Sequence, residues 1–236
     1  MFKVSVITTL YNYRDYIQDN IKSFLEQDFL KSELIIVDDA SVDNPYGVIK
    51  KYLGDRIKYI RLDENLGYSH AKNVGIREAR SGILVMLDAD DMLTKNGIST
   101  RYKKISKGYD FVHGPSLDMK EGRPLVRNRM WDLWLQNKTY TYVHAQGVML
   151  RKKIHSEIGL YDETLRCKSD REFFARVFNH NFRIGTVDQD VSLYRRHKKQ
   201  MHCSPEKAKI NKKLQKEVLK KIETRKTDLS DLEMLV

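Results

Sequence analysis

The sequence has few of the features by which secreted and membrane proteins are recognised. Its two cysteines, Cys167 and Cys203, are too few for a disulfide framework and do not form a Cys-x-x-Cys metal site, so we expect free thiols in a reducing compartment. No apolar run approaches the roughly 20 residues of a membrane-spanning helix. The opening MFKVSVITTLYNY lacks a signal-peptide pattern and instead predicts a strand. We therefore expect a cytoplasmic protein, soluble or at most peripheral at the inner membrane surface.

Glycine-rich phosphate loops, internal repeats and low-complexity linkers are absent as well. Without a Gly-x-Gly-x-x-Gly loop, the sequence gives no support to a nucleotidyltransferase. The chain has 236 residues, of which 41% are hydrophobic and 10% aromatic. This length and composition predict a globular protein with a sizeable core and exclude a disordered chain.

Positive charge is concentrated in one C-terminal segment. The net charge is +11, and Arg195–Lys226 alone contains thirteen Lys and Arg against three Glu. A helix is predicted at about Pro205–Thr224, because apolar residues recur there at every fourth position: Ile210, Leu214, Val218 and Ile222. Three interpretations of this helix remain open: packing on the catalytic domain, attachment to an anionic membrane surface, or contact with a polyanion such as nucleic acid.

The N-terminal half alternates strand and helix patterns. The predicted strands are Val4–Thr8, Glu33–Ser41, Ile57–Leu62 and Ile83–Leu87, and the predicted helices are Arg14–Gln27, Pro45–Leu53 and Tyr68–Ala79. This order predicts an α/β protein with a mostly parallel central sheet and helices on both faces. Ligands of such sheets bind at the carboxyl ends of the strands.

Beyond Gly114 the alternation fades. Pro115–Tyr142 shows little periodicity and predicts a loop-rich layer beside the site. A strand, a helix and a strand are then predicted at Gly147–Lys153, Arg171–Val177 and Val191–Arg196.

Three carboxylates follow the fourth predicted strand, in the stretch ILVMLDADDML. One aspartate there would be enough to cap a following helix. Asp88, Asp90 and Asp91 together indicate a divalent cation held by oxygen ligands, as Mg²⁺ or Mn²⁺ is beside a diphosphate.

Two carboxylates, Asp38 and Asp39, follow the second predicted strand. We expect one of them to cap a turn or to pair with a nearby Arg or Lys. The other is suited to accept a hydrogen bond from a nucleobase N–H. Gly75, inside a predicted helix, indicates a close neighbour, because glycine within a helix costs about 1 kcal/mol relative to alanine.

Taken together, four ordered motifs resemble family-2 glycosyltransferases with the GT-A fold. They are VSVITTLYN, ELIIVDDAS, ENLGYSHAKNVGIREARSG and LVMLDADD. Further on, GVMLRKKIHSEIGLYDETL followed by SDREFFARV resembles the acceptor-side half of that family. The resemblance covers roughly residues 2–197. It implies a catalytic domain at 1–200, with a nucleotide-sugar-binding half at 1–114 and an acceptor-side half at 115–200, and a basic helical extension at 201–236.

The resemblance implies a role for each of several residues in the donor half. Thr9, Tyr11 and Asp39 would line the nucleoside pocket, with Asp39 accepting from the base N–H, as uracil N3–H would allow. Asp88 and Asp90 form the D-x-D element. Asp90, with Asp91 as a further ligand, would bind Mn²⁺ or Mg²⁺ on the diphosphate.

In the acceptor half, the resemblance implies that Asp170 is the general base. The family often has Glu-Asp at this point, and Ser169 replaces the Glu here. His197 matches the histidine that completes the metal site in many relatives, or is an exposed residue of the basic segment. Trp131 and Trp134 are predicted either to stack on an acceptor sugar or to pack in the core.

Three functions are therefore carried forward. The first is an inverting, metal-dependent glycosyltransferase that moves a sugar, preferably from a UDP-sugar, to a glycan or lipid-linked glycan. The second is the same chemistry on a nucleic-acid acceptor, suggested by the basic segment. The third is a nucleotide-sugar-binding module without turnover, suggested by Ser169 and His197.

Overall fold

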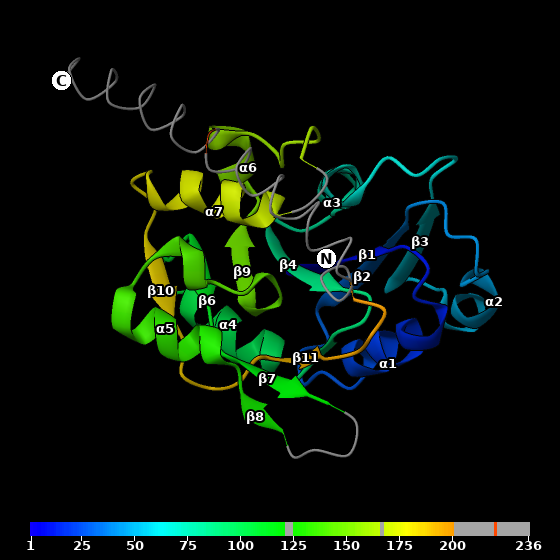
Figure 1. Ribbon diagram of the computed structural model, residues 1–236, viewed down its shortest axis with the longest axis horizontal. Helices are drawn as coiled ribbons and strands as arrows, with labels where there is room; N and C mark the ends of the chain where they lie inside the picture. The colour runs from blue at the N-terminus through cyan, green and yellow to red at the C-terminus, as the bar shows by residue number, and fades with distance from the viewer. Residues whose placement is uncertain (121–124, 166–167, 201–219, 221–236) are drawn as a thin grey trace.

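A seven-stranded sheet lies at the centre of the computed structural model, which describes residues 1–120, 125–165 and 168–200 together with Lys220 (Figure 1). Its strands are β1 (Val4–Leu10), β2 (Ser32–Asp38), β3 (Ile57–Arg61), β4 (Ile83–Asp88), β6 (Phe111–His113), β9 (Val148–Arg151) and β10 (Ile184–Thr186). The strand order is β10-β6-β9-β4-β1-β2-β3. All paired strands are parallel except β9, which runs antiparallel to both β4 and β6. The predicted mostly parallel sheet is confirmed.

Helices cover both faces of this sheet. They are α1 (Arg14–Leu25), α2 (Tyr46–Ile49), α3 (Tyr68–Glu78), α4 (Gly97–Ile105), α5 (Arg129–Asn137), α6 (Lys153–Ile158) and α7 (Ser169–Phe178), with 3-10 turns η1 (Lys50–Tyr52), η2 (Tyr140–Tyr142) and η3 (Ala145–Gly147). Alternate residues of each strand face opposite sides. Val6 and Leu34 pack with α1 and α4, whereas Ile7 and Ile35 pack with α3, α5 and α7. The apolar strand runs are therefore buried on both faces.

The register of the central strands brings polar residues together at one edge. In β1, Thr9 lies beside Asp88 of β4, and Leu10 lies beside Asp38 of β2. The carboxyl ends of three neighbouring strands thus meet where the sequence becomes polar, which is where parallel sheets bind ligands.

A smaller, four-stranded sheet closes this edge from the side. Its strands are β5 (Met92–Leu93), β7 (Ser116–Met119), β8 (Val126–Arg127) and β11 (Ser192–Arg195), in the order β5-β11-β7-β8. Because β5 follows the carboxylate turn directly, its pairing with β11 brings residues near 195 beside residues near 90. The chain far downstream therefore joins the predicted site.

Gly75 in α3 has the packing role expected for it. A Cβ at this position would lie 2.4 Å from Cγ2 of Ile7 and 3.4 Å from Cγ2 of Val37. The absence of a side chain therefore lets α3 approach β1 and β2 closely.

The region predicted as loop-rich, Pro115–Tyr142, contains regular structure, so that expectation was wrong in part. It holds β7, β8 and α5. The helix begins where the side chain of Asn128 accepts a hydrogen bond from the Met130 N–H at 2.8 Å, and ends at Lys138 in a left-handed conformation. The strands β6, β7, β8 and β10 have two to four residues, too few to show a period, and they were missed, as were the helices α4 and α6.

The predicted basic helix at Pro205–Thr224 lies outside the described residues, apart from Lys220. The three interpretations of this helix, as packed on the catalytic domain, attached to a membrane surface or in contact with a polyanion, therefore concern residues outside the described ones. Within the part of the chain that is described, no helix combines the length and the apolar character needed to cross a membrane.

Candidate active site

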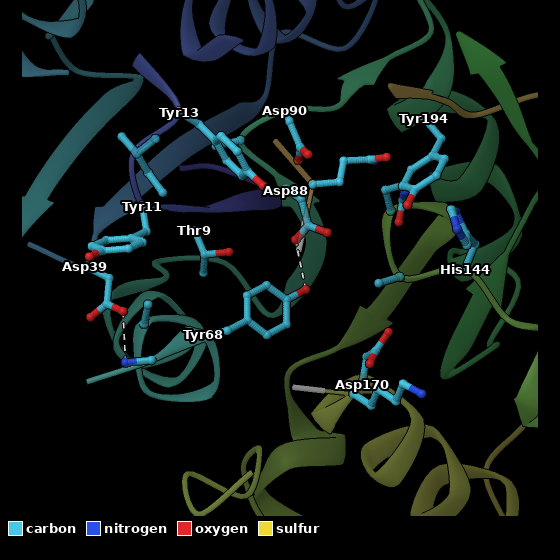
Figure 2. A pocket seen from close by; sticks show the side chains of 18 of the residues that line it. Thr9, Tyr11, Tyr13, Asp39, Tyr68, Asp88, Asp90, His144, Asp170 and Tyr194 are labelled. Atoms are coloured by element: carbon cyan, nitrogen blue, oxygen red, sulfur yellow. Dashed lines mark hydrogen bonds between the residues drawn. The ribbon is translucent and has the colours of Figure 1, made fainter. Parts of the chain in front are cut away.

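A cavity of about 820 Å³ opens at the carboxyl ends of β1, β2 and β4 (Figure 2). This volume lies within the range of pockets that hold small molecules and cofactors. Residues of both halves of the chain line it. The predicted site residues that line it are Thr9, Tyr11, Asp39, Asp88, Asp90 and Asp170.

One end of the cavity is formed by Thr9, Tyr11 and Asp39, which Figure 2 shows grouped together. The carboxylate of Asp39 accepts hydrogen bonds from the backbone N–H groups of Leu66 and Gly67, both at 2.8 Å. Gly67 has a φ of 95°, which favours glycine at the turn before α3. Asp39 thus holds this turn, and because a carboxylate has about four lone-pair sites, it can still accept from a ligand N–H.

The neighbouring Asp38 has the structural role expected of one of the two aspartates, which is to cap a turn or pair with a basic residue. One of its oxygens accepts from the Ser41 N–H at 2.9 Å, and the other accepts from Nη1 of Arg61 at 2.8 Å and from the Tyr59 hydroxyl. Asp38 therefore caps a turn and pairs with an arginine, while Asp39 faces the cavity.

The middle of the cavity is formed by the carboxylate turn. The Tyr68 hydroxyl donates to Oδ1 of Asp88 at 2.8 Å. Burial raises the pKa of the Asp88 carboxyl and the charge of Asp90 raises it further, while the Lys72 ammonium opposes both effects. Lys72 is itself buried, with Nζ 3.9 Å from the centre of the Tyr68 ring, and burial lowers its pKa. The turn is thus a buried concentration of negative charge, and the Lys72 ammonium lies behind Asp88.

Asp90 faces the cavity, and Nε2 of His197 lies 3.0 Å from its Oδ2. His197 reaches this position because it follows β11, which pairs with β5. The structure therefore brings together the two residues expected to share a metal ion, although they are 107 positions apart in the chain.

Asp91 is placed differently from the expectation that it would ligate the metal. It is fully buried, it does not line the cavity, and its Oδ1 accepts from the Arg195 N–H at 2.9 Å. The two adjacent side chains point in different directions here, so Asp90 faces the cavity and Asp91 faces β11. Burial, together with the charges of Asp90 and Asp88, raises the pKa of Asp91 well above its ordinary value. We therefore drop Asp91 from the ligand set.

The remaining donor set fits a cation bound mainly by a diphosphate. Among the described residues, no group of three or more His, Cys, Asp and Glu side chains is arranged to hold a metal ion. Mg²⁺ and similar ions are commonly held by one or two carboxylates together with substrate phosphates and water. The cavity-facing carboxylate of Asp90, with the imidazole of His197 beside it, meets that requirement.

Across the cavity from Asp39 lies Asp170, in the first turn of α7 (Figure 2). Ser169, which stands where the family often has Glu, is fully buried and does not line the cavity. Asp170 therefore lines the cavity in a chain that has Ser at the preceding position.

The structure does not bring Trp131 and Trp134 to the site. They are 4% and 5% exposed, do not line the cavity, and pack against His113, with ring centres 5.7 and 4.3 Å away. Their faces are enclosed in the core and cannot stack on a sugar in this arrangement. The packing interpretation accounts for both residues.

Sequence reasoning missed several residues that line the cavity. His144 and Tyr194 meet edge to face, with ring centres 4.6 Å apart, and Tyr13 and Tyr68 flank the carboxylates. Burial lowers the pKa of His144 to about 4, so this imidazole is neutral at pH 7. Their position in the sequence was the only available signal: Tyr13 shortly follows the predicted strand Val4–Thr8, and Tyr68 begins the predicted helix Tyr68–Ala79. His144 had no such signal.

The mostly parallel sheet, with a carboxylate turn at the carboxyl ends of its strands and a second carboxylate across the cavity, has the architecture of the GT-A fold. The family model described as "Glycosyl transferase family 2" matches residues 5–159. The chain belongs to this family and is a glycosyltransferase.

Curated relatives agree with this assignment. The chain is 36% identical over 203 residues to TuaG of Bacillus subtilis, a glycosyltransferase whose name assigns it provisionally to teichuronic acid biosynthesis; the match covers 81% of this chain and 78% of TuaG. It is 37% identical over 126 residues to the GalNAc(5)-diNAcBac-PP-undecaprenol beta-1,3-glucosyltransferase of Campylobacter jejuni, covering 52% of this chain and 40% of that enzyme.

Solved structures share the fold. TarS of S. aureus, residues 1–349 in complex with UDP, superposes with a TM-score of 0.74 at 24% identity, covering 94% of this chain and 64% of that one. The mannosyltransferase PcManGT of Pyrobaculum calidifontis, in complex with GDP-Man and Mn²⁺, gives a TM-score of 0.70 at 19% identity, covering 85% and 59%. The chain thus spans less than two thirds of either solved structure, and these likenesses carry the fold alone.

Proposed function

We propose that this glycosyltransferase moves a sugar from a UDP-sugar to a hydroxyl of a glycan or lipid-linked glycan, with inversion and with dependence on Mn²⁺ or Mg²⁺. The observation that carries the proposal is that a single cavity is lined by Asp39, Asp90 and Asp170. The position of Asp39 is suited to the nucleobase, that of Asp90 to the diphosphate and that of Asp170 to the acceptor hydroxyl.

The donor end is suited to a nucleoside. Tyr11, which is half-exposed at the cavity, offers an aromatic face, and Asp39 offers an acceptor for uracil N3–H. The neighbouring TarS structures were solved with UDP and with UDP-GlcNAc, which supports a uridine donor. PcManGT was solved with GDP-Man, so a guanosine donor is the alternative to be tested.

The metal would be held by Asp90 and His197. A divalent cation bound there would neutralise the diphosphate as it leaves. The chain's own part is to hold the Asp90 carboxylate towards the cavity, with His197 beside it and Asp91 anchoring β11 behind it. PcManGT was solved with Mn²⁺, which supports the use of a divalent cation.

Asp170 would act as the general base. From the far side of the cavity it would accept the proton of the acceptor hydroxyl as that oxygen attacks the anomeric carbon, on the face opposite the leaving diphosphate. One attack from that face inverts the configuration. We expect Asp170→Asn to lower transfer by about 10²- to 10⁴-fold, the usual contribution of a positioned base.

The acceptor would be a glycan or a lipid-linked glycan. The names of two relatives support this class, since one refers to teichuronic acid and the other to an undecaprenol-linked oligosaccharide.

The proposal is tested by thermal unfolding with a panel of nucleotide sugars, with and without Mn²⁺. Ligand at about 100 times its Kd stabilises the native state by about 2.7 kcal/mol, which is about 5 to 10 °C for a chain of this size. We expect this shift for a UDP-sugar with Mn²⁺, a smaller one in Asp90→Ala, and a full one in Asp170→Asn. If no nucleotide sugar shifts the wild type, the proposed donor site is wrong; a full shift with normal transfer in Asp170→Asn removes Asp170 as the base.

A further inference from the structure

The acceptor end of the cavity is lined by basic side chains. Lys168, Arg171 and Arg196 all line it beside Asp170. We propose that the acceptor carries an anionic group, a phosphate or a carboxylate, close to the hydroxyl that is glycosylated, and that Arg171 and Arg196 bind this group. The inference rests on the proposed function, because it takes Asp170 as the residue that faces the acceptor.

Arg171 is the central observation. It follows Asp170 in the first turn of α7, is partly buried and lines the cavity. Its backbone N–H bonds to Lys168, but among the described residues its guanidinium has no hydrogen bond, ion pair or ring contact. A guanidinium has five donors in a planar fork that matches a carboxylate or a phosphate. An anionic group on the acceptor would give this guanidinium a partner.

Arg196 is held in place from behind. Its Nε and Nη2 atoms lie 3.1 and 2.9 Å from Oδ2 of Asp118, and its guanidinium stacks 4.5 Å from the centre of the Tyr194 ring. Asp118 balances its charge, so among the described residues Arg171 is the guanidinium at this end without a charged partner. A side chain fixed in this way is pre-organised to add a second contact to a bound anion.

His144 shows that these groups converge on one place. His144, Asp170, Arg171 and Arg196 line the same cavity, and the charges of Asp170, Arg196, Asp118 and Arg171 all act on the imidazole of His144. Its Nδ1 atom is buried and has no hydrogen-bond partner among the described residues. Because burial keeps this ring neutral, it contributes a polar contact and no charge, and the arginines remain the groups that select for an anion.

The ordinary alternative is that Arg171 binds the donor diphosphate. Figure 2 shows Asp170 and His144 on the side of the cavity away from Tyr11 and Asp39, with Asp88 and Asp90 between the two sides, so we assign Arg171, which follows Asp170, to the acceptor side of the diphosphate. The two alternatives make opposite predictions for Arg171→Gln. If Arg171 serves the acceptor, donor binding is unchanged; if it serves the diphosphate, donor binding weakens.

The test measures acceptor binding directly, in the presence of saturating UDP and Mn²⁺ so that no turnover occurs. The probes are two matched pairs: the p-nitrophenyl glycosides of glucuronic acid and glucose, and N-acetylglucosamine 6-phosphate with N-acetylglucosamine. Dissociation constants come from ligand-observed NMR titration. We expect at least one anionic probe to bind ten times or more tightly than its neutral partner, with an affinity that falls as salt is raised.

The variants make the result specific. Arg171→Gln should remove the preference, and Arg171→Lys, which keeps the charge but loses the planar fork, should keep part of it. Lys103→Gln removes one positive charge from an exposed position on α4 outside the cavity and should change nothing. A preference for phosphate alone or for carboxylate alone identifies the anion.

Three outcomes overturn the inference: no preference in either pair, no binding of any probe, or an undiminished preference in Arg171→Gln. A thermal shift with UDP and Mn²⁺, measured on each protein, separates these failures from failure of the proposed function. If the wild type shows no such shift, the donor site itself is at fault.

Discussion

The carboxylate of Asp91 accepts a hydrogen bond from the backbone N–H of Arg195 at 2.9 Å, and this bond joins the turn after β4 to the strand that leads to His197. The side chain of Arg195 reinforces the join, because its Nε donates to the backbone carbonyl of Asp90 at 3.0 Å. The distance of 3.0 Å between His197 and Asp90 therefore depends on contacts made by residues that do not line the cavity.

Replacing Asp91 with alanine should weaken metal binding without touching a ligand. Without the Asp91 carboxylate, the end of β11 and the following His197 are held less firmly. Changes to groups that support metal ligands typically reduce metal affinity about 10- to 100-fold. Calorimetric titration of Mn²⁺ in the presence of UDP measures the effect. Asp91→Asn keeps an oxygen acceptor for the Arg195 N–H and should stay close to wild type. Equal affinity in the alanine variant would mean that other contacts hold His197.

Asn73 of α3 joins the two halves of the chain, and replacing it should destabilise the protein strongly. Its Nδ2 donates to the carbonyl of Tyr161 and its Oδ1 accepts from the Tyr161 N–H, at 2.9 and 3.0 Å, while Nδ2 also donates to Glu163 at 2.8 Å. Asn73→Ala leaves the buried backbone groups of Tyr161 unpaired, so we expect a loss of about 3 kcal/mol in urea unfolding.

Asn137, exposed near the end of α5 with one bond to the carbonyl of Leu133, is the matched control for Asn73. Asn137→Ala should change stability by less than about 0.5 kcal/mol. Similar losses in the two variants would show that Asn73 does not join the two halves.

Much of the donor half could be predicted because its signals are local. Long apolar runs identify buried strands, and the carboxyl ends of parallel strands meet at one edge whatever the loops do. Thr9, Asp39 and Asp90 therefore line one cavity, as their positions at or just after the ends of β1, β2 and β4 implied. Asp170 was found through the family resemblance and had no periodic signal of its own.

The rest depended on contacts between distant segments. Adjacent aspartates look equivalent in a sequence, but Asp90 faces the cavity and Asp91 faces β11, a difference set by strand pairing across about 100 positions. The two tryptophans, three apart on one helix, are compatible with either packing or binding until the partner of that face is known. Here the partner is His113, and the rings are enclosed.

Gly75→Ala should destabilise the protein although alanine is the better helix former. Alanine gains about 1 kcal/mol of helix propensity. Its Cβ would, however, lie 2.4 Å from Cγ2 of Ile7 in a fully packed core, and such overpacking typically costs about 1–3 kcal/mol. We expect a net loss in urea unfolding. Gly82, where an added Cβ meets nothing within 4 Å, is the control, and a stabilised Gly75→Ala would show that α3 moves away from β1 easily.

Stability should fall as the pH falls below about 6.5, because three buried histidines resist protonation in the folded chain. Burial lowers the pKa of His113 and His155 to about 3 and that of His144 to about 4, against about 6.5 when unfolded. Between those values the unfolded chain binds protons that the folded chain does not, so each histidine contributes stability that is complete above pH 6.5 and is lost on acidification, by up to about 1.4 kcal/mol per pH unit.

The raised pKa values of Asp88 and Asp91 act in the opposite direction over part of this range, so the informative measurement is the difference between two proteins. His113→Gln removes one histidine far from the carboxylates, in a position enclosed by Trp131 and Trp134. Urea unfolding of wild type and variant between pH 4.5 and 7.5 should show a flatter dependence in the variant, by about 1.4 kcal/mol per pH unit below pH 6. Parallel curves would mean that His113 already carries its proton in the folded chain, in conflict with its enclosure by the two indole rings.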